Sequence, residues 1–318
     1  MRRLAPIAVK LVVSGALLYF AVSRVNFAMI GNRLDRIEPG WIAAAMAIAL
    51  LHAGLVAIRW RWVALGCGAT LPPRQALRLS LIGGFFNQVL PSTVGGDAVR
   101  IWLLARSGAG WSKASYSVLL DRYFGLLVLA AAVTAGLPWS FSLIQNPIGR
   151  VALLVIGLGS MAGSAAFLAL GQWRWLENWR LTRHLVTMAG LARQILFSRG
   201  SGAAIIGVSL LIHALIAAIA WNMARAVAAP LEFAHAFLLV LPVMLIASIP
   251  ISIAGWGVRE TALVLAFSYA GLPESDGLIV SLLLGAAMLA VGLVGAIVWL
   301  ASGEKLKSAA ASRSDAPG

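Results

Sequence analysis

Two apolar segments of the chain contain the same interruption, the first between Leu90 and Arg100 and the second between Ile249 and Glu260. In each, a proline is followed by a serine, a pair of glycines, a valine and, nine residues after the proline, an arginine. Proline removes a helical hydrogen bond and glycine loosens the backbone, so both segments are predicted to break a helix. Matched breaks in two halves of a membrane protein are typical of a transporter-type site.

The composition places these breaks in a membrane. The 318 residues are 61% hydrophobic and only 11% charged, whereas soluble domains have about 25% charged residues. No hydrophilic stretch is long enough for an appended soluble catalytic domain. The net charge of +14 lies in short loops between apolar runs, where topology control and attraction to anionic lipid explain it better than nucleic-acid binding.

We therefore expect an all-α polytopic membrane protein, with one integral membrane domain over residues 1–303 and a disordered cytoplasmic tail over 304–318. A first half over about 1–140 and a second half over about 149–303 would each contain one break. Full spans are predicted at 5–23, 41–58, 115–137, 149–170, 203–224 and 278–300. The interrupted segments 79–106 and 235–270 are predicted to be re-entrant helical hairpins.

The first run could be a cleaved signal peptide, but Lys10 interrupts it and no convincing small-residue cleavage site follows, so a retained span is favoured. With the N-terminus in the cytoplasm, 18 basic residues fall on the inside, Arg59 among them, and 6 on the outside. This bias predicts that both termini are cytoplasmic. The two hairpins would then enter from opposite sides, which defines an inverted repeat. Chance similarity is the alternative, because Gly, Pro and Val are common in membrane helices.

The longest polar connection, 172–200, has apolar residues at helical spacing with arginines among them. It predicts an amphipathic helix in the cytoplasmic interface, acting either as a linker or as a lipid sensor.

Few ionisable groups fall at predicted membrane depth, and each costs about 2.5–3.5 kcal/mol at a helix centre. Local spacing suggests that Asp97 pairs with Arg100 and Asp121 with Arg122, whereas the adjacent Arg259 and Glu260 should reach different partners. These groups either lock the helices together as internal ion pairs or line a polar cavity for a charged headgroup. Arginine forks suit phosphate, and a helix that restarts after Gly95-Gly96 or Gly255-x-Gly257 offers free N–H groups to an anion.

No nucleotide-binding, zinc-protease or nucleophile-elbow motif occurs, so we predict no catalytic residues, no metal and no cofactor, and the protein is not expected to be an enzyme. The four histidines lack metal-ligand spacing and are predicted to be packing or hydrogen-bonded residues.

Three ordered motifs carry a family resemblance: Asn87-x-x-Leu90-Pro91-x-x-x-Gly95-Gly96-Asp97-x-x-Arg100, then Asp121-Arg122, then Pro250-x-Ser252-x-x-Gly255-x-Gly257-x-Arg259-Glu260. Over nearly its whole length the chain resembles the lysylphosphatidylglycerol synthase transmembrane-region family, as a stand-alone member without the soluble synthase domain. The resemblance implies a multi-pass protein of the bacterial inner membrane. In two-part relatives this region translocates aminoacylated phosphatidylglycerol. The second half departs from the pattern, because Leu282-Leu283 stand where a repeat of Asp121-Arg122 would fall.

Our leading hypothesis is a lipid flippase-like translocator that moves a polar or anionic headgroup through a cavity between the two hairpins. The predicted substrate-binding residues are those of the three motifs: Asn87, Pro91, Gly95, Gly96, Asp97, Arg100, Asp121, Arg122, Pro250, Ser252, Gly255, Gly257, Arg259 and Glu260. The alternative is an intramembrane transferase or accessory subunit in glycolipid, polyprenyl-lipid or hopanoid biosynthesis. The expected partners are membrane lipids rather than nucleic acid. A partner enzyme of lipid biosynthesis and a homo-oligomer both remain open.

Overall fold

The computed structural model describes residues 5–23, 37–90, 94–172, 182–249 and 255–302. Every regular element in these ranges is helical, as the apolar runs predict. In chain order the elements are α1 Ala5–Ser23, α3 Pro39–Gly66, α4 Pro73–Val89, α5 Gly95–Leu104, the π-helical η1 Ala105–Ala109, α6 Trp111–Leu143, α7 Pro147–Leu170, α8 Arg183–Leu196, α9 Ser201–Ala226, α10 Phe233–Ala247, α11 Val258–Tyr269 and α12 Glu274–Ala301.

Five described helices are long and apolar enough to cross a bilayer: α3, α6, α7, α9 and α12. They coincide with five of the six predicted spans. The predicted first span has the bounds of α1, Ala5–Ser23. Two helices extend well past the predicted spans: α6 continues past residue 137 to Leu143, and α3 continues past residue 58 to Gly66. No proline or glycine stands between residue 58 and Gly66 to stop α3 earlier.

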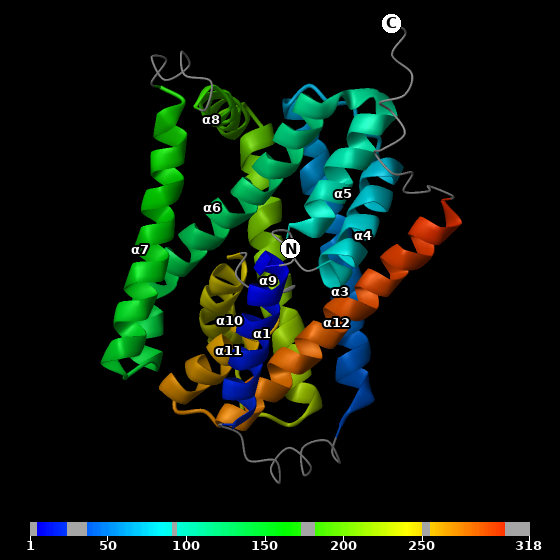
Figure 1. Ribbon diagram of the computed structural model, residues 1–318. Coiled ribbons are helices and arrows are strands. Elements are labelled where there is room, and N and C mark those ends of the chain that lie inside the picture. Colours follow the sequence, from blue (N-terminus) through cyan, green and yellow to red (C-terminus); the bar gives the residue numbers. More distant parts are fainter. Residues whose placement is uncertain (1–4, 24–36, 91–93, 173–181, 250–254, 303–318) are drawn as a thin grey trace, which may run out of the picture.

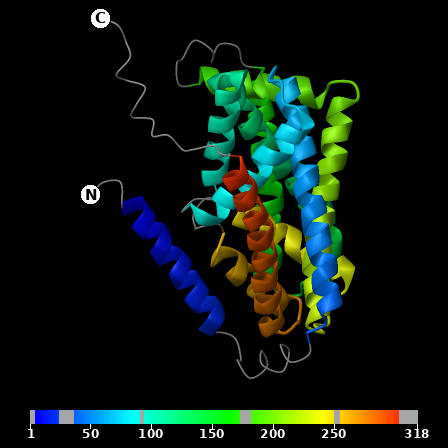
Figure 2. The ribbon, with the colours of Figure 1, turned by 90° about the vertical axis from the view of Figure 1, so that its right-hand side faces the viewer.

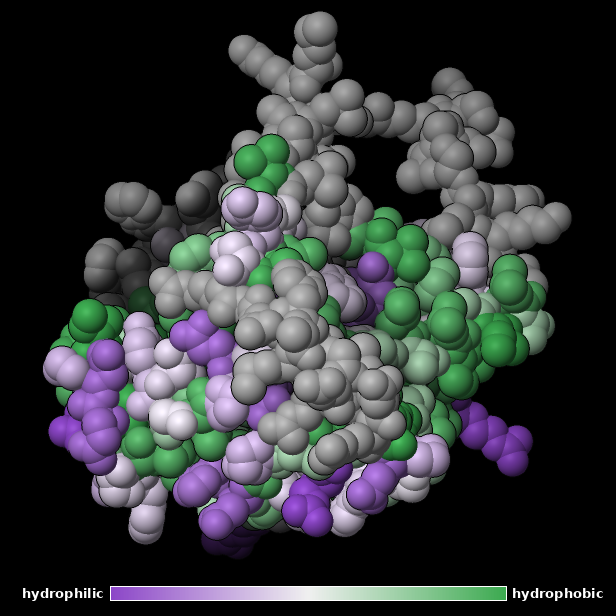
Figure 3. All heavy atoms as spheres, turned by 90° about the horizontal axis from the view of Figure 1, so that it is seen from below, coloured by the Kyte–Doolittle hydropathy of each residue, from purple (hydrophilic) through white to green (hydrophobic). Residues whose placement is uncertain are grey.

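Each segment predicted to be a hairpin contains two short helices, α4 and α5 in the first and α10 and α11 in the second. Figure 1 shows α4 running from the upper end of the bundle to mid-height and α5 returning, whereas α10 and α11 make the same excursion from the lower end. Figure 3 views the lower end and shows hydrophilic residues among hydrophobic ones, as expected where helices meet water. Helix α8 lies across the upper end within the predicted amphipathic segment, with Val186, Ala189, Ala192 and Ile195 buried. The tail from residue 304 lies outside the described residues.

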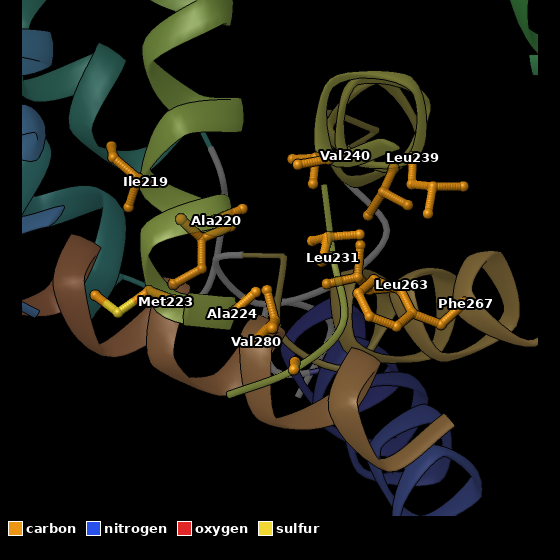
Figure 4. Close-up of a cluster of buried hydrophobic side chains, with 14 of the residues drawn as sticks. Ile219, Ala220, Met223, Ala224, Leu231, Leu239, Val240, Leu263, Phe267 and Val280 are labelled. Carbon is orange, nitrogen blue, oxygen red and sulfur yellow. The ribbon is translucent and has the colours of Figure 1, made fainter. Parts of the chain in front are cut away.

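The largest buried cluster is made mostly by the second half. Ile219, Ala220 and Met223 of α9 belong to one buried cluster with Leu239 and Val240 of α10, to which α11 and α12 also contribute. In Figure 4 Ala220 lies on the side of α9 toward α10, whereas Ile219 and Met223 lie on its other side. By contrast, α1 leans away from the bundle toward its N-terminal end (Figure 2). It is held near its C-terminal end, where Ala21 packs against Val264 and Leu278.

The turns that follow α3 and α9 have the same conformation. The turn residue has positive φ in both, +72° at Gly68 and +51° at Ala228. The next amide, of Ala69 or Ala229, donates to the carbonyl five residues earlier at 2.9 Å in both turns. Since α3 runs upward and α9 downward in Figure 1, the same turn stands at opposite ends of the bundle.

Candidate functional site

A buried carboxylate joins three helices of the first half. Asp121 of α6 accepts a hydrogen bond from Arg59 Nε of α3 at 2.8 Å and one from Arg100 Nη2 of α5 at 3.0 Å. All three side chains are less than a tenth exposed. Arg59 also donates to Ser209 of α9 at 3.3 Å. Both oxygens of Asp121 are thus engaged by guanidinium groups in charge-assisted hydrogen bonds.

A second carboxylate extends this group toward the surface. Asp97 Oδ1 accepts from Arg100 Nη1 at 3.3 Å, and Asp97 Oδ2 lies 2.7 Å from Arg122 Nε. The second contact is an ion pair without hydrogen-bond alignment, since no described donor is aligned with Oδ2. The Arg122 side chain is 31% exposed, which makes it the most accessible member. We call Arg59, Asp97, Arg100, Asp121 and Arg122 the arginine cluster.

The break before α5 explains how Asp97 and Arg100 reach this position. The Gly96 amide donates to Asn87 Oδ1 of α4 at 2.8 Å, which ties the start of α5 to the end of α4. A Cβ on Gly96 would collide with the Gly83 carbonyl oxygen, so only glycine allows so close an approach. Asp97 then stands in the first turn of α5, where the helix dipole favours an anion, and Arg100 follows one turn later.

Aromatic and small residues hold the arginines in place. The Arg100 guanidinium lies 4.0 Å from the ring centroid of Trp60, whose indole N–H donates to Ser117 at 3.3 Å. A Cβ on Gly125 would stand 2.9 Å from Arg59 Nη1, so the guanidinium fills the space above this glycine. Stacking on an indole away from water is worth about 2 kcal/mol, which helps to offset burial of the charge.

The second half holds a smaller cluster of Arg259, Glu260 and Ser281, which we call the Arg259 cluster. Glu260 Oε1 accepts from Arg259 Nη2 at 2.6 Å and from the Ser281 hydroxyl at 3.1 Å, and Arg259 Nε donates to Ser281 at 3.2 Å. Glu260 Oε2 accepts the Gly257 amide at 2.6 Å, which caps the start of α11. Gly257 has φ of +84°, a conformation that favours glycine. The Arg259 cluster is electrically neutral.

The predicted site residues are therefore divided between two groups. Gly95 and Gly255, which has φ of +82°, begin or precede the helices that carry the two arginines. Among the described contacts none joins one cluster to the other, although α12 packs against both hairpins, with Gly285 beneath Arg259 and Gly292 against Gln88. Pro91, Pro250 and Ser252 lie outside the described residues.

Two predicted pairings were wrong. Asp121 pairs with Arg59 and Arg100 rather than with its neighbour Arg122, because successive residues point about 100° apart on a helix. Arg259 and Glu260 bind each other instead of separate partners, since the long arginine side chain folds back at the first turn of α11.

Sequence reasoning missed Arg59, which had been assigned to the cytoplasmic loop after a span ending at residue 58. The available signal was the uninterrupted helical sequence that continues to Gly66. It also missed Trp60, Ser117 and Ser281, whose roles depend on contacts between helices. His213 Nε2 donates a hydrogen bond to the Gly125 carbonyl at 2.9 Å, as expected of a hydrogen-bonded packing residue.

Apolar cavities lie between the helices. One of about 370 Å³ lies between α1, α7, α10 and α11, where Leu17, Leu153, Pro242, Val258 and Thr261 line it. Another of about 690 Å³ lies between α6, α8 and α9. No charged residue lines either cavity. Val258 and Thr261 flank the Arg259–Glu260 pair on α11, so the first cavity adjoins the Arg259 cluster through one helix.

A family model described as the lysylphosphatidylglycerol synthase TM region matches residues 7–296 of the chain. No curated protein matches the sequence. Among the described residues, no three His, Cys, Asp or Glu side chains gather as a metal ion would require.

Proposed function

Because the chain belongs to the lysylphosphatidylglycerol synthase transmembrane-region family, we propose that it is a flippase-like translocator that moves a polar or anionic lipid headgroup between leaflets of the membrane. The observation that carries this proposal is the arginine cluster. Five ionised side chains inside a bundle of membrane-spanning helices are costly, and such groups commonly mark a substrate path. Guanidinium groups also present paired donors that match phosphate oxygens.

In this proposal the hairpins α4–α5 and α10–α11 re-enter the bilayer from opposite sides as halves of an inverted repeat. The matched turns at Gly68 and Ala228 support the repeat, since they extend the similarity beyond the two breaks. Both termini are cytoplasmic. The acyl chains remain in lipid or in the apolar cavity beside α11 while the headgroup passes through the protein.

The engaged carboxylates favour passive exchange between leaflets. Asp97, Asp121 and Glu260 each lie against an arginine. A carboxylate held in this way is a poor proton carrier, because protonation would leave the arginine unpaired in the membrane. We therefore propose that the protein equilibrates lipid without a proton gradient.

Reconstitution in liposomes tests the function. A lipid with a fluorescent tail and an anionic headgroup is added symmetrically, and a membrane-impermeant quencher reports the fraction exposed outside. The protein should raise that fraction from about half to nearly all. Arg100→Lys should slow the exchange, because a point charge replaces a fork, whereas Arg106→Lys at an exposed position should not.

Mass spectrometry of the same vesicles, supplied with candidate donor lipids, tests the alternative transferase. A new lipid species without leaflet exchange would overturn the translocator in favour of that enzyme.

A further inference from the structure

The arginine cluster has more positive than negative charge. It contains three guanidinium groups and two carboxylates, so the five residues sum to one positive charge. The Arg259 cluster, with one arginine and one glutamate, sums to zero. An excess charge among membrane-spanning helices is unfavourable unless an anion joins it, so of the two clusters of described residues the arginine cluster is the one that favours an anionic ligand.

Unused hydrogen-bonding capacity lies at the same place. Arg100 Nε is buried with no hydrogen-bond partner among the described residues, and Arg100 as a whole is only 7% exposed. Asp97 Oδ2 also lacks an aligned donor, although Arg122 Nε is 2.7 Å away. Buried polar atoms are normally satisfied, so a spare donor beside an excess positive charge indicates an acceptor that carries negative charge.

Arg122 is the member that can change partner. Its side chain is 31% exposed, against 8% for Arg59 and 9% for Arg100. Its contact with Asp97 is unaligned, whereas Arg59 and Arg100 donate aligned hydrogen bonds to Asp121. Release of Arg122 therefore leaves the Asp121 centre intact.

From this geometry we propose that Arg122 exchanges Asp97 for the phosphate of a lipid whose headgroup carries one net negative charge. The inference rests on the proposed translocator function and names its substrate class. Binding one monoanion makes the arginine cluster neutral. A zwitterionic headgroup leaves the positive charge uncompensated, and a dianionic phosphomonoester adds a negative charge in excess. Asp97 thus acts as an internal substitute that holds Arg122 until the phosphate arrives.

The test compares three probe lipids with one tail in phosphatidylcholine vesicles: a monoanionic phosphodiester (phosphatidylglycerol), a zwitterionic one (phosphatidylcholine) and a phosphomonoester (phosphatidic acid). The protein should exchange the monoanion about tenfold faster than the other two, the factor expected of one hydrogen bond to a charged group. Equal exchange rates for all three probes would overturn the proposed preference for a monoanionic headgroup, but the protein would still be a lipid translocator. No exchange of any probe would instead remove the proposed function.

Two variants test whether the preference for the monoanionic lipid depends on Arg122. Arg122→Gln makes the cluster neutral without a ligand, so the monoanion should lose its advantage, whereas Arg106→Gln, at an exposed position on η1, should keep it. An unchanged preference in a folded Arg122→Gln protein would overturn the exchange.

Asp97→Asn gives a second, independent reading if the first variant folds poorly. It raises the cluster to two positive charges, and the preference should move toward the phosphomonoester. If the Asp97→Asn protein exchanged the three probe lipids in the same order of rates as the unmodified protein, the proposal would be contradicted. Inorganic phosphate added on both sides tests whether the ligand is free phosphate, and complete inhibition at millimolar concentration would assign the site to that ion instead of a lipid.

Discussion

Arg59 on α3 donates its Nε–H to Asp121 on α6 across 2.8 Å, although the two residues are 62 positions apart in the chain. The other oxygen of Asp121 accepts a hydrogen bond from Arg100 of α5, so one carboxylate joins the long helix α3 to the first hairpin. These two hydrogen bonds tie α5, the second helix of the first hairpin, to α3 and α6 and so hold the arginine cluster together.

Substitutions at this pair should differ in severity. Asp121→Asn leaves two buried arginines without their carboxylate and should cost about 3–5 kcal/mol of stability. Arg59→Met leaves Asp121 with Arg100 and should cost less, about 1.5–3 kcal/mol, the value of one hydrogen bond to a charged group. Thermal unfolding in detergent measures both, with Arg61→Met on the same helix as the control. A larger loss for Arg59→Met than for Asp121→Asn would contradict the assignment of Asp121 as the shared centre.

Two glycines of the first hairpin should respond in opposite ways to alanine. A methyl group on Gly96 would meet the Gly83 carbonyl and the Asn87 side chain, so Gly96→Ala should push α5 from α4 and lower both stability and lipid exchange. Nothing lies within 4 Å of a Cβ on Gly84, which is inside α4. Gly84→Ala should therefore be neutral or stabilise by roughly 0.5–1 kcal/mol. Unfolding curves for the two variants check the pair, and equal effects would show that the close approach at Gly96 does not hold the hairpin.

The matched turns predict reciprocal effects. Ala228 has φ of +51°, which strains a residue with a side chain, so Ala228→Gly should stabilise the protein by up to about 1 kcal/mol. Gly68 has φ of +72°, and Gly68→Ala should destabilise by a similar amount. Melting temperatures measure both changes. Shifts of the same sign would argue against equivalent turns in the two halves.

The thiol of Cys67 should be inert. Burial raises its pKa from 9.0 to about 12, because the charged thiolate is disfavoured away from water. The thiolate is the reactive form, so a maleimide should not label the folded protein as the pH rises from 7 to 9, whereas the unfolded chain should become labelled. Rapid labelling of the native protein at pH 8 would contradict the burial of Cys67.

An inert Cys67 also allows topology to be mapped on the otherwise unmodified chain. Arg74→Cys introduces an exposed thiol in the first turn of α4. Glu232→Cys introduces one at the residue that precedes α10. The two thiols should react from opposite sides of the membrane, Arg74→Cys from the cytoplasm. Labelling of both from one side would remove the inverted repeat.

The sequence by itself determined where the helices lie and where they break. Apolar runs placed the long helices, since burial in lipid requires a continuous stretch, although α3 and α6 extend further than predicted. Proline and glycine predicted breaks near 91 and 250 because these residues act on the local backbone, and α4 and α10 end at Val89 and Ala247. It also singled out Asp97, Arg100, Asp121, Arg259 and Glu260 as charges that must be compensated.

Only the tertiary structure decided which arginine pairs with which carboxylate. Arg59 looked like a loop residue, and Arg122 looked like the partner of Asp121, because sequence spacing reports only neighbours along one helix. The actual pairs depend on which helices touch and at what height, and close contacts such as that of Gly96 with Gly83 set that height. The excess positive charge of the arginine cluster follows from those long-range contacts, and it becomes visible only when α3, α5 and α6 are brought together.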